Sequence, residues 1–198
     1  MELTNIALAF GSSLTAGFKL YMTVWALGLM DRFEVMNLPE RLEILSHSWV
    51  LGTASVLLVI EFFADKIPYV DNTWDTIHSF IRVPAGALLA AGAVGDVGQP
   101  LLWITSLTGG FVSFTAHGAK ASTRLAVNAT PEPFSNWFLS LLEDGLSILV
   151  LCLIANHPVI AIALTLFLLF SCVFIVFLFY KFLKALFRPG QTAIQRTC

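Results

Sequence analysis

The stretch EFFADKIPYVDNTWDTIHSFIR, residues 61–82, concentrates ionisable side chains in a chain whose charged fraction is only 12%. Several of them recur every three or four residues, which places them on one face of an α-helix. Tryptophan and isoleucine occupy the complementary positions. The stretch therefore predicts a short amphipathic or re-entrant helix over 71–82, whose polar face carries Asp71, Asp75, His78 and Arg82.

The rest of the chain is strongly apolar. Its hydrophobic fraction is 57%, with a mean hydropathy of +0.81 and 17 phenylalanines, well above an ordinary soluble domain. About 20 apolar residues are needed to cross a bilayer. The composition predicts an all-α polytopic membrane helix bundle, one membrane domain over 1–198, with about six spans at residues 5–30, 46–63, 80–98, 100–122, 137–155 and 158–183.

A weak internal repeat accompanies these spans. TAGFK at 15–19 is similar to TAHGAK at 115–120, and the segments that begin at Pro39 and Pro131 are also alike. Each copy, about 5–98 and about 100–183, would hold three spans. An odd number of spans inverts the second copy relative to the first, as in many transporters. Residues 184–198 would form a cytoplasmic tail.

The distribution of basic residues predicts orientation. Lys66, Arg82, Lys120 and Arg124 flank two connections, whereas the opposite side has Arg32 and Arg41 among acidic residues. Because Lys and Arg favour the cytoplasmic side, we expect both termini in the cytoplasm. The net charge of −2 gives no reason to expect a nucleic-acid partner.

This orientation brings charged groups from several segments to one cytoplasm-facing cluster. Such groups are expensive in a membrane unless they face one another, water or a ligand. The cluster is either an ion-pair network that holds helices together or a site for an ion or solute. Its predicted members are Glu61, Asp65, Lys66, Asp71, Asp75, His78, Arg82, His117, Lys120, Arg124, Glu143 and Asp144.

Two ligand types suit parts of this cluster. Asp71, Asp75 and His78 offer oxygen and imidazole ligands to a divalent metal ion. His117, Lys120 and Arg124 form a basic stripe for a phosphate or carboxylate, and the two interpretations combine into a metal-plus-phosphate site.

Lys19 lies near the middle of the first predicted span. Thr15 and Thr23 share its helical face, so the three residues form a polar stripe deeper than the cluster. We interpret the stripe as part of a permeation pathway in which Lys19 pairs with an acid from another span. The alternative is that the lysine side chain extends to an interface.

The motifs EFFADKIP, PAGALLAAG, AHGAKASTR, NATPEPFSN and LLEDG resemble those of DUF4126, a bacterial membrane-protein family of unknown function. The likeness covers about residues 11–150. Thr130 stands where a serine is expected before Pro131, a change that preserves the hydroxyl group. The resemblance implies a multi-pass protein of the bacterial inner membrane and no particular activity.

Taken together, these patterns favour a small transporter or channel whose charged cluster binds an ion or a small anionic solute. The alternatives are a metal-dependent enzyme acting on a lipid phosphate, without an obvious nucleophile, and a structural or assembly protein. We expect the lipid bilayer as a partner and allow a homo-oligomer. No cofactor is expected, except a divalent metal ion in the enzyme interpretation.

Overall fold

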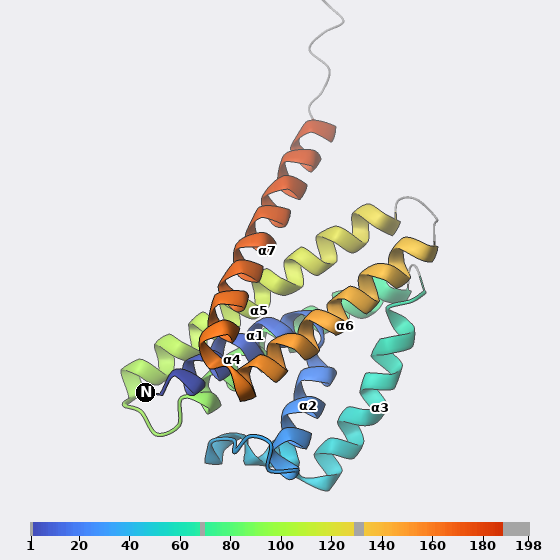
Figure 1. Cartoon of the computed structure of the whole chain (residues 1–198). Helices are drawn as coiled ribbons and strands as arrows, with labels where there is room; N and C mark the ends of the chain where they lie inside the picture. Colours follow the sequence, from blue (N-terminus) through green and yellow to red (C-terminus); the bar gives the residue numbers. More distant parts are fainter. Residues whose placement is uncertain (1, 68–69, 129–132, 188–198) are drawn as a thin grey trace, which may run out of the picture.

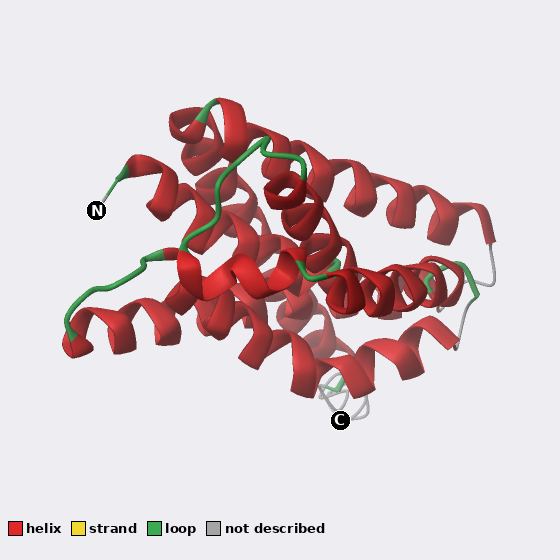
Figure 2. Ribbon diagram, turned by 90° about the horizontal axis from the view of Figure 1, so that it is seen from below, coloured by secondary structure: helices red, strands yellow, loops and turns green. Residues whose placement is uncertain are grey.

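The computed structural model describes residues 2–67, 70–128 and 133–187. In this part of the chain every regular element is helical and there are no strands (Figures 1 and 2), which confirms the all-α prediction. The elements are α1 Leu3–Phe18, α2 Leu20–Arg32, the 3₁₀ helix η1 Glu40–Ser46, α3 Ser48–Ala64, α4 Val70–Ala93, α5 Gln99–Asn128, α6 Pro133–Asn156 and α7 Pro158–Leu186.

Two of the described helices are long and apolar enough to cross a membrane. They are α6, over Phe134–Asn156, with a mean hydropathy of 2.1, and α7, with 3.0. Helices η1 and α3, bent by 64°, would make a third span if they are taken together. These helices indicate membrane association. The six predicted spans and the inverted repeat are not confirmed, because among the described helices only α6, α7 and the bent pair of η1 and α3 have the length and hydropathy of a span.

Helix α4 joins two elements that the sequence predicted separately. The expected short helix at 71–82 and the span at 80–98 are one continuous helix, which includes Pro84. The buried face of α4 is polar and charged from Asp71 to Arg82, and from Gly86 onward it consists of small and apolar residues. The polar face of residues 71–82 therefore points into the bundle and not toward a membrane surface.

The first predicted span is broken in the structure. Helix α1 ends at Phe18, and the extended backbone of Lys19 (φ −142°, ψ 83°) separates it from α2. Helix α1 runs parallel to α5, because Ile6 shares a cavity with Thr108 and the Phe18 carbonyl accepts a hydrogen bond from Lys120. Helix α2 then leads away from this break (Figure 1).

Successive helices alternate in direction. Helix α7 is also parallel to α5, since Ile162 lies near Thr108 at one end and Phe179 lies near Thr123 at the other. The start of α1 therefore lies at the opposite end of the bundle from the end of α5. This arrangement differs from the expectation that both termini share one side.

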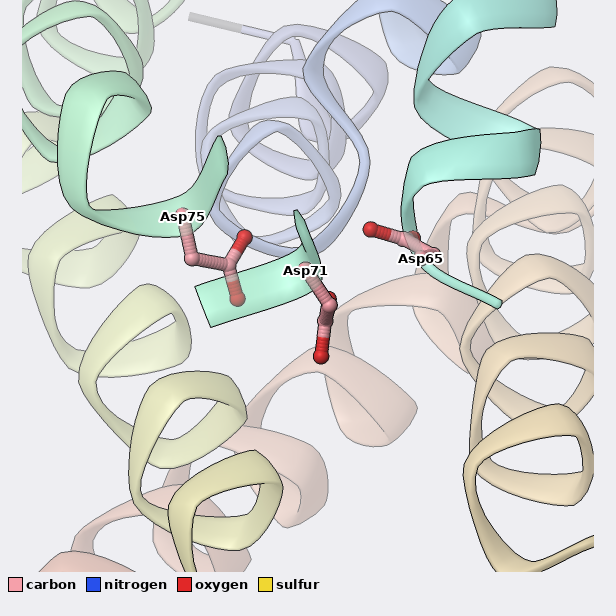
Figure 3. A group of neighbouring side chains, drawn as sticks. All are labelled: Asp65, Asp71 and Asp75. Atoms are coloured by element: carbon pink, nitrogen blue, oxygen red, sulfur yellow. The ribbon is translucent and has the colours of Figure 1, made fainter. Parts of the chain in front are cut away.

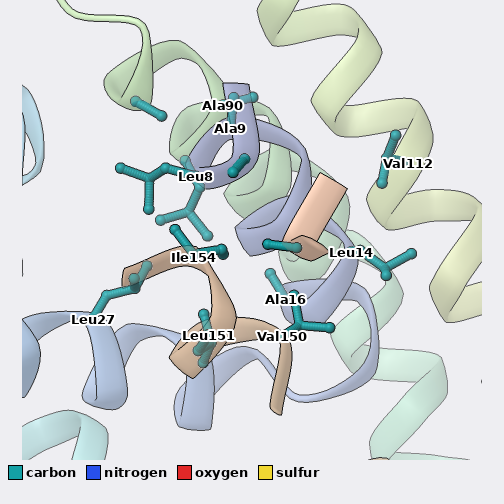
Figure 4. Packing of buried hydrophobic residues seen from close by; sticks show 14 of the residues in the cluster. Leu8, Ala9, Leu14, Ala16, Leu27, Ala90, Val112, Val150, Leu151 and Ile154 are labelled. Carbon is teal, nitrogen blue, oxygen red and sulfur yellow. The ribbon is translucent and has the colours of Figure 1, made fainter. Parts of the chain in front are cut away.

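The apolar half of the core lies away from the charged residues. It includes Leu8, Leu14, Val150, Leu151 and Ile154, all fully buried (Figure 4). Small residues let α1, α4 and α5 approach closely, as in other membrane bundles. A methyl group added at Gly109 would lie 2.8 Å from the Gly86 carbonyl oxygen and 2.9 Å from Ser13 Oγ.

Candidate functional site

Ten charged side chains meet at the end of the bundle where α1 breaks and α5 ends. They come from helices α3, α4, α5 and α6, from the break between α1 and α2, and from the α3–α4 connection. Each is at most 8% exposed. Figure 3 shows three of them, Asp65, Asp71 and Asp75, close together. We call this set the charged cluster: Lys19, Glu61, Asp65, Asp71, Asp75, Arg82, Lys120, Arg124, Glu143 and Asp144.

Arg82 holds α3 and α4 together at one side of the cluster. Its guanidinium donates to Glu61 Oε1 at 2.7 Å and to Asp75 Oδ1 at 2.7 Å. It also lies 3.0 Å from His117 Nδ1 on α5. Arg82 and Glu61 are fully buried, so each charge depends on the other for compensation.

Lys120 occupies the centre of the cluster. Its Nζ lies 3.2 Å from Asp65, 3.4 Å from Asp75 and 3.8 Å from Glu143. The ammonium group thus lies close to carboxylates from three segments, and a small movement of its side chain would change its nearest partner.

Arg124 connects α5 to α6. It donates to Glu143 at 2.8 and 3.3 Å, to the Asn136 side chain and carbonyl at 2.7 and 3.1 Å, and to the Asp65 carbonyl at 3.0 Å. Asp71 lies 3.7 Å away, too far for a hydrogen bond. Neither oxygen of the fully buried Asp71 carboxyl accepts a hydrogen bond from a described residue.

Lys19 belongs to this cluster and not to a separate, deeper stripe. It pairs with Asp65 and, at 2.8 Å, with Asp144 on α6. The Thr15 and Thr23 hydroxyls donate to carbonyls of the same chain segment, at Gly11 and at Lys19. The predicted acid partner for Lys19 is therefore present, but the two threonines are satisfied locally.

Carboxylates outnumber cations in the cluster. Six acids are linked by ion pairs to four basic groups. Lys66 lies at the edge, its ammonium 3.0 Å above the Phe62 ring centroid, and counting it still leaves an excess of acid. Burial alone would raise the pKa of Asp65, but Lys120 and Lys19 outweigh burial and hold that pKa below its usual range.

The structure offers a metal ion a set of ligands that differs from the predicted Asp71, Asp75 and His78. His78 stacks on Trp74 and lies 2.9 Å from the Tyr21 hydroxyl, whereas carboxylate oxygens of Asp65, Asp71 and Asp75 lie within 4.8 Å of one another. However, the Lys120 ammonium is in contact with two of these three carboxylates, and it competes with a metal ion for them.

His117 and Ser79 make a close pair that resembles a nucleophile and its base. Their Nε2 and Oγ atoms are 2.6 Å apart. Arginine only donates hydrogen bonds, so the contact with Arg82 makes His117 Nδ1 an acceptor and leaves the proton on Nε2. His117 then donates to Ser79, which itself donates to the Asp75 carbonyl. In this state His117 cannot take the proton of Ser79.

Sequence reasoning missed three polar residues of α6. Asn136, Ser140 and Ser147 are buried on the same helix face as Glu143 and Asp144. Their spacing of four, three, one and three residues is the signal that could have identified them. Single serines in an apolar segment are weak indicators, because they often bond to their own helix.

The fold and the site together define a class: an all-α, membrane-associated protein with a buried network of ion pairs. The chain matches the family model described as "Domain of unknown function (DUF4126)" over residues 6–178. It therefore belongs to this family, as the sequence motifs indicated. A search of curated proteins and a search of solved structures each found no match.

Proposed function

We propose that this protein is an integral protein of the bacterial inner membrane that transports a small cation, in the first place a proton, through the charged cluster. The observation that carries the proposal is Asp71, a fully buried carboxyl group that accepts no hydrogen bond within the described part of the chain. As an ion it is expensive to bury, because its ion pair with the Arg124 guanidinium, 3.7 Å away, is too long for a hydrogen bond. With a proton bound it becomes neutral, so it can take up and release that proton during transport.

The charge balance favours a cation over the anionic solute that the sequence also allowed. Every basic group of the cluster already contacts a carboxylate. An anion would have to displace these acids, whereas a cation or a proton would reduce the excess of negative charge.

Several cations of the charged cluster share the same acid partner. This sharing favours a network that rearranges during transport over a fixed structural framework. Lys19 and Lys120 both contact Asp65, and Lys120 and Arg124 both lie near Glu143. Protonation of one acid would free a cation to bind another, which is a means of gating by exchange of ion pairs. The break between α1 and α2 at Lys19 resembles the interrupted helices of transporters.

The enzyme interpretation is less well supported. The hydrogen bonds of His117 leave it unable to activate Ser79, and Lys120 competes for the carboxylates that would hold a metal ion. Absence of cation flux, together with metal-dependent turnover of a phospholipid or a polyprenyl phosphate by the purified protein, would instead establish this enzyme.

The proposal predicts that Asp71→Asn abolishes proton flux. Asparagine has nearly the shape of a protonated aspartate but cannot exchange a proton, so the variant should fold and transport should fall to the level of empty liposomes. Flux is measured with a pH-sensitive dye inside proteoliposomes under an imposed membrane potential. The matched control is Asp96→Asn, since Asp96 is an exposed carboxylate that pairs with Arg41 outside the cluster. Normal flux in Asp71→Asn would refute the proton-carrier role.

Orientation gives a second test. The Asn128 side chain donates to Asn72 at 3.0 Å, so the two residues lie on the same side. Cysteines introduced at these two positions should react with a thiol reagent added on the cytoplasmic side, as should Cys198 in the predicted tail. Asn37 should label from the other side. The direction of α1 favours labelling of a cysteine at Glu2 together with Asn37, which revises the predicted cytoplasmic N-terminus. Labelling of Asn37 and Asn128 from one side would contradict the arrangement.

A further inference from the structure

A cavity of about 230 Å³ lies between α5, α6 and α7, beside the charged cluster. Figure 1 shows α6 and α7 diverging from the turn that joins them. Leucines make most of the cavity wall, namely Leu139, Leu142, Leu146 and Leu168. Leu142 and Ile175, which also line the cavity, are 44% and 38% exposed. Because α6 and α7 are the helices with the length and hydropathy of a span, this opening faces the bilayer.

Two members of the charged cluster, Lys120 and Glu143, also line this cavity. Glu143 is 7% exposed, whereas the other members apart from Asp144 are at most 3% exposed. The cavity therefore connects the apolar surface of α6 and α7 with the edge of the charged cluster at Glu143. An occupant would have an apolar part toward the bilayer and a polar group toward this carboxylate.

Lys120 has no hydrogen-bond donor to spare for such an occupant. An ammonium group has three N–H donors. The Lys120 Nζ atom lies 3.3 Å from the Phe18 carbonyl, 3.2 Å from both carboxylate oxygens of Asp65 and 3.4 Å from Asp75. These acceptors already match its donors, so an anionic head group would have to displace one of them.

The other polar groups that line the cavity can accept further hydrogen bonds. Each Glu143 oxygen accepts one bond from Arg124, but an ionised carboxylate has about four lone-pair sites. The hydroxyl groups of Thr123 and Ser171 donate to carbonyls of their own helices, at 2.8 and 2.9 Å, and their oxygens remain acceptors. The cavity thus offers acceptors to a ligand, which favours a head group that donates hydrogen bonds.

We propose that this cavity binds the protonated form of a single-chain lipophilic amine that enters from the bilayer. The ammonium head donates to Glu143, and the excess acid of the charged cluster favours its positive charge. The chain lies along the leucines and continues into the bilayer. The cavity is smaller than the roughly 300–1,000 Å³ of sites for drug-sized ligands, so it suits one narrow chain and not a two-chain phospholipid. Asp71 does not line the cavity, and the site goes beyond the proposed proton transport.

The test is photolabelling of the full chain in lipid nanodiscs by a primary amine whose decyl chain carries a diazirine group. Labelled residues are identified by mass spectrometry, and we expect the label on the cavity wall, including Leu146 and Leu168. Decylamine, decanol and decyl sulfate, which share one chain, then compete with the probe, with concentrations expressed as mole fractions of the bilayer. Decylamine should halve the labelling at about one-tenth of the decanol concentration, because a charge-assisted hydrogen bond is roughly twice as strong as a neutral one. Decyl sulfate should compete least.

Two variants separate the contribution of the head group from that of the chain. Glu143→Gln keeps the size of the side chain but removes its charge, so decylamine should compete no better than decanol. Ser171→Phe lies outside the charged cluster, fills the cavity and should abolish the label on its wall. The matched control is Ser106→Phe, at a partly exposed serine of α5 that does not line the cavity. Equal competition by decanol and decylamine, or an unchanged label in Ser171→Phe, would overturn the site. Because labelling does not depend on flux, either result leaves the proposed role of Asp71 to its own test.

Discussion

Replacing Arg82 with glutamine is expected to destabilise the protein by about 3–5 kcal/mol, the cost of removing one partner from a buried ion pair. Arg82 is fully buried and compensates both Glu61 and Asp75. Glutamine fills part of the volume but removes the cation that pairs with Glu61, and it leaves Asp75 with Lys120 alone, 3.4 Å away. The measurement is chemical or thermal unfolding of the purified protein in detergent, followed by tryptophan fluorescence. Arg124→Gln should act in the same direction, because Glu143 loses its nearest cation and keeps only Lys120 at 3.8 Å.

Arg41→Gln is the control for this effect. Arg41 also pairs with one aspartate, Asp96, at 2.9 Å, but the pair is exposed, and exposed pairs contribute little. Its loss should leave the unfolding midpoint nearly unchanged. A similar, small effect of Arg41→Gln and Arg82→Gln would mean that the buried groups are separately solvated and do not form one network.

Replacing Lys19 with leucine is expected to abolish cation flux in proteoliposomes. The ammonium group of Lys19 bridges Asp65 and Asp144 at the break between α1 and α2, the point where exchange of ion pairs would couple these helices. Leucine retains the bulk of the side chain but removes the charge. Flux should fall to the level of empty liposomes, whereas a chelator added to the original protein should leave its flux unchanged.

Lys19→Arg keeps the charge and should retain measurable flux, which separates loss of charge from general damage. Size-exclusion chromatography shows whether both variants remain folded. Unchanged flux in folded Lys19→Leu would remove Lys19 from the pathway. Loss of flux on chelation would favour a metal ion, with Asp65, Asp71 and Asp75 as its candidate ligands.

Much of the charged cluster could be predicted because helical spacing is local information. Asp71, Asp75 and Arg82 share one face of α4, and Lys120 and Arg124 share one face of α5. Once the basic residues indicated which connections share a side, these faces had to lie near one another. Ion pairs link these faces to Glu61, Asp65 and Glu143, and Asp144 joins the cluster through Lys19, as the sequence suggested.

The break at Lys19 could not be predicted in this way. The segment from Phe18 to Leu20 contains no proline and its own propensities favour a continuous helix. The break depends on tertiary contacts, because Lys120 donates to the Phe18 carbonyl and two acids from elsewhere in the chain hold the Lys19 side chain. The position of the His78 ring could not be predicted either. His78 lies on the same face of α4 as Asp71 and Asp75, but its ring contacts Tyr21 and Trp74 and not the charged cluster.

The alternating direction of the seven α-helices has a practical consequence for joining two copies of this protein. Leu3 and Leu186 lie at opposite ends of the bundle, as the parallel course of α1, α5 and α7 requires. In a covalent tandem made with a short linker, the second copy would begin on the side where the first copy ends. In the proposed membrane orientation the second copy would be inverted relative to the first, unless the linker itself contained one more crossing helix. Concatenated proteins intended to fix subunit number should therefore include such a helix.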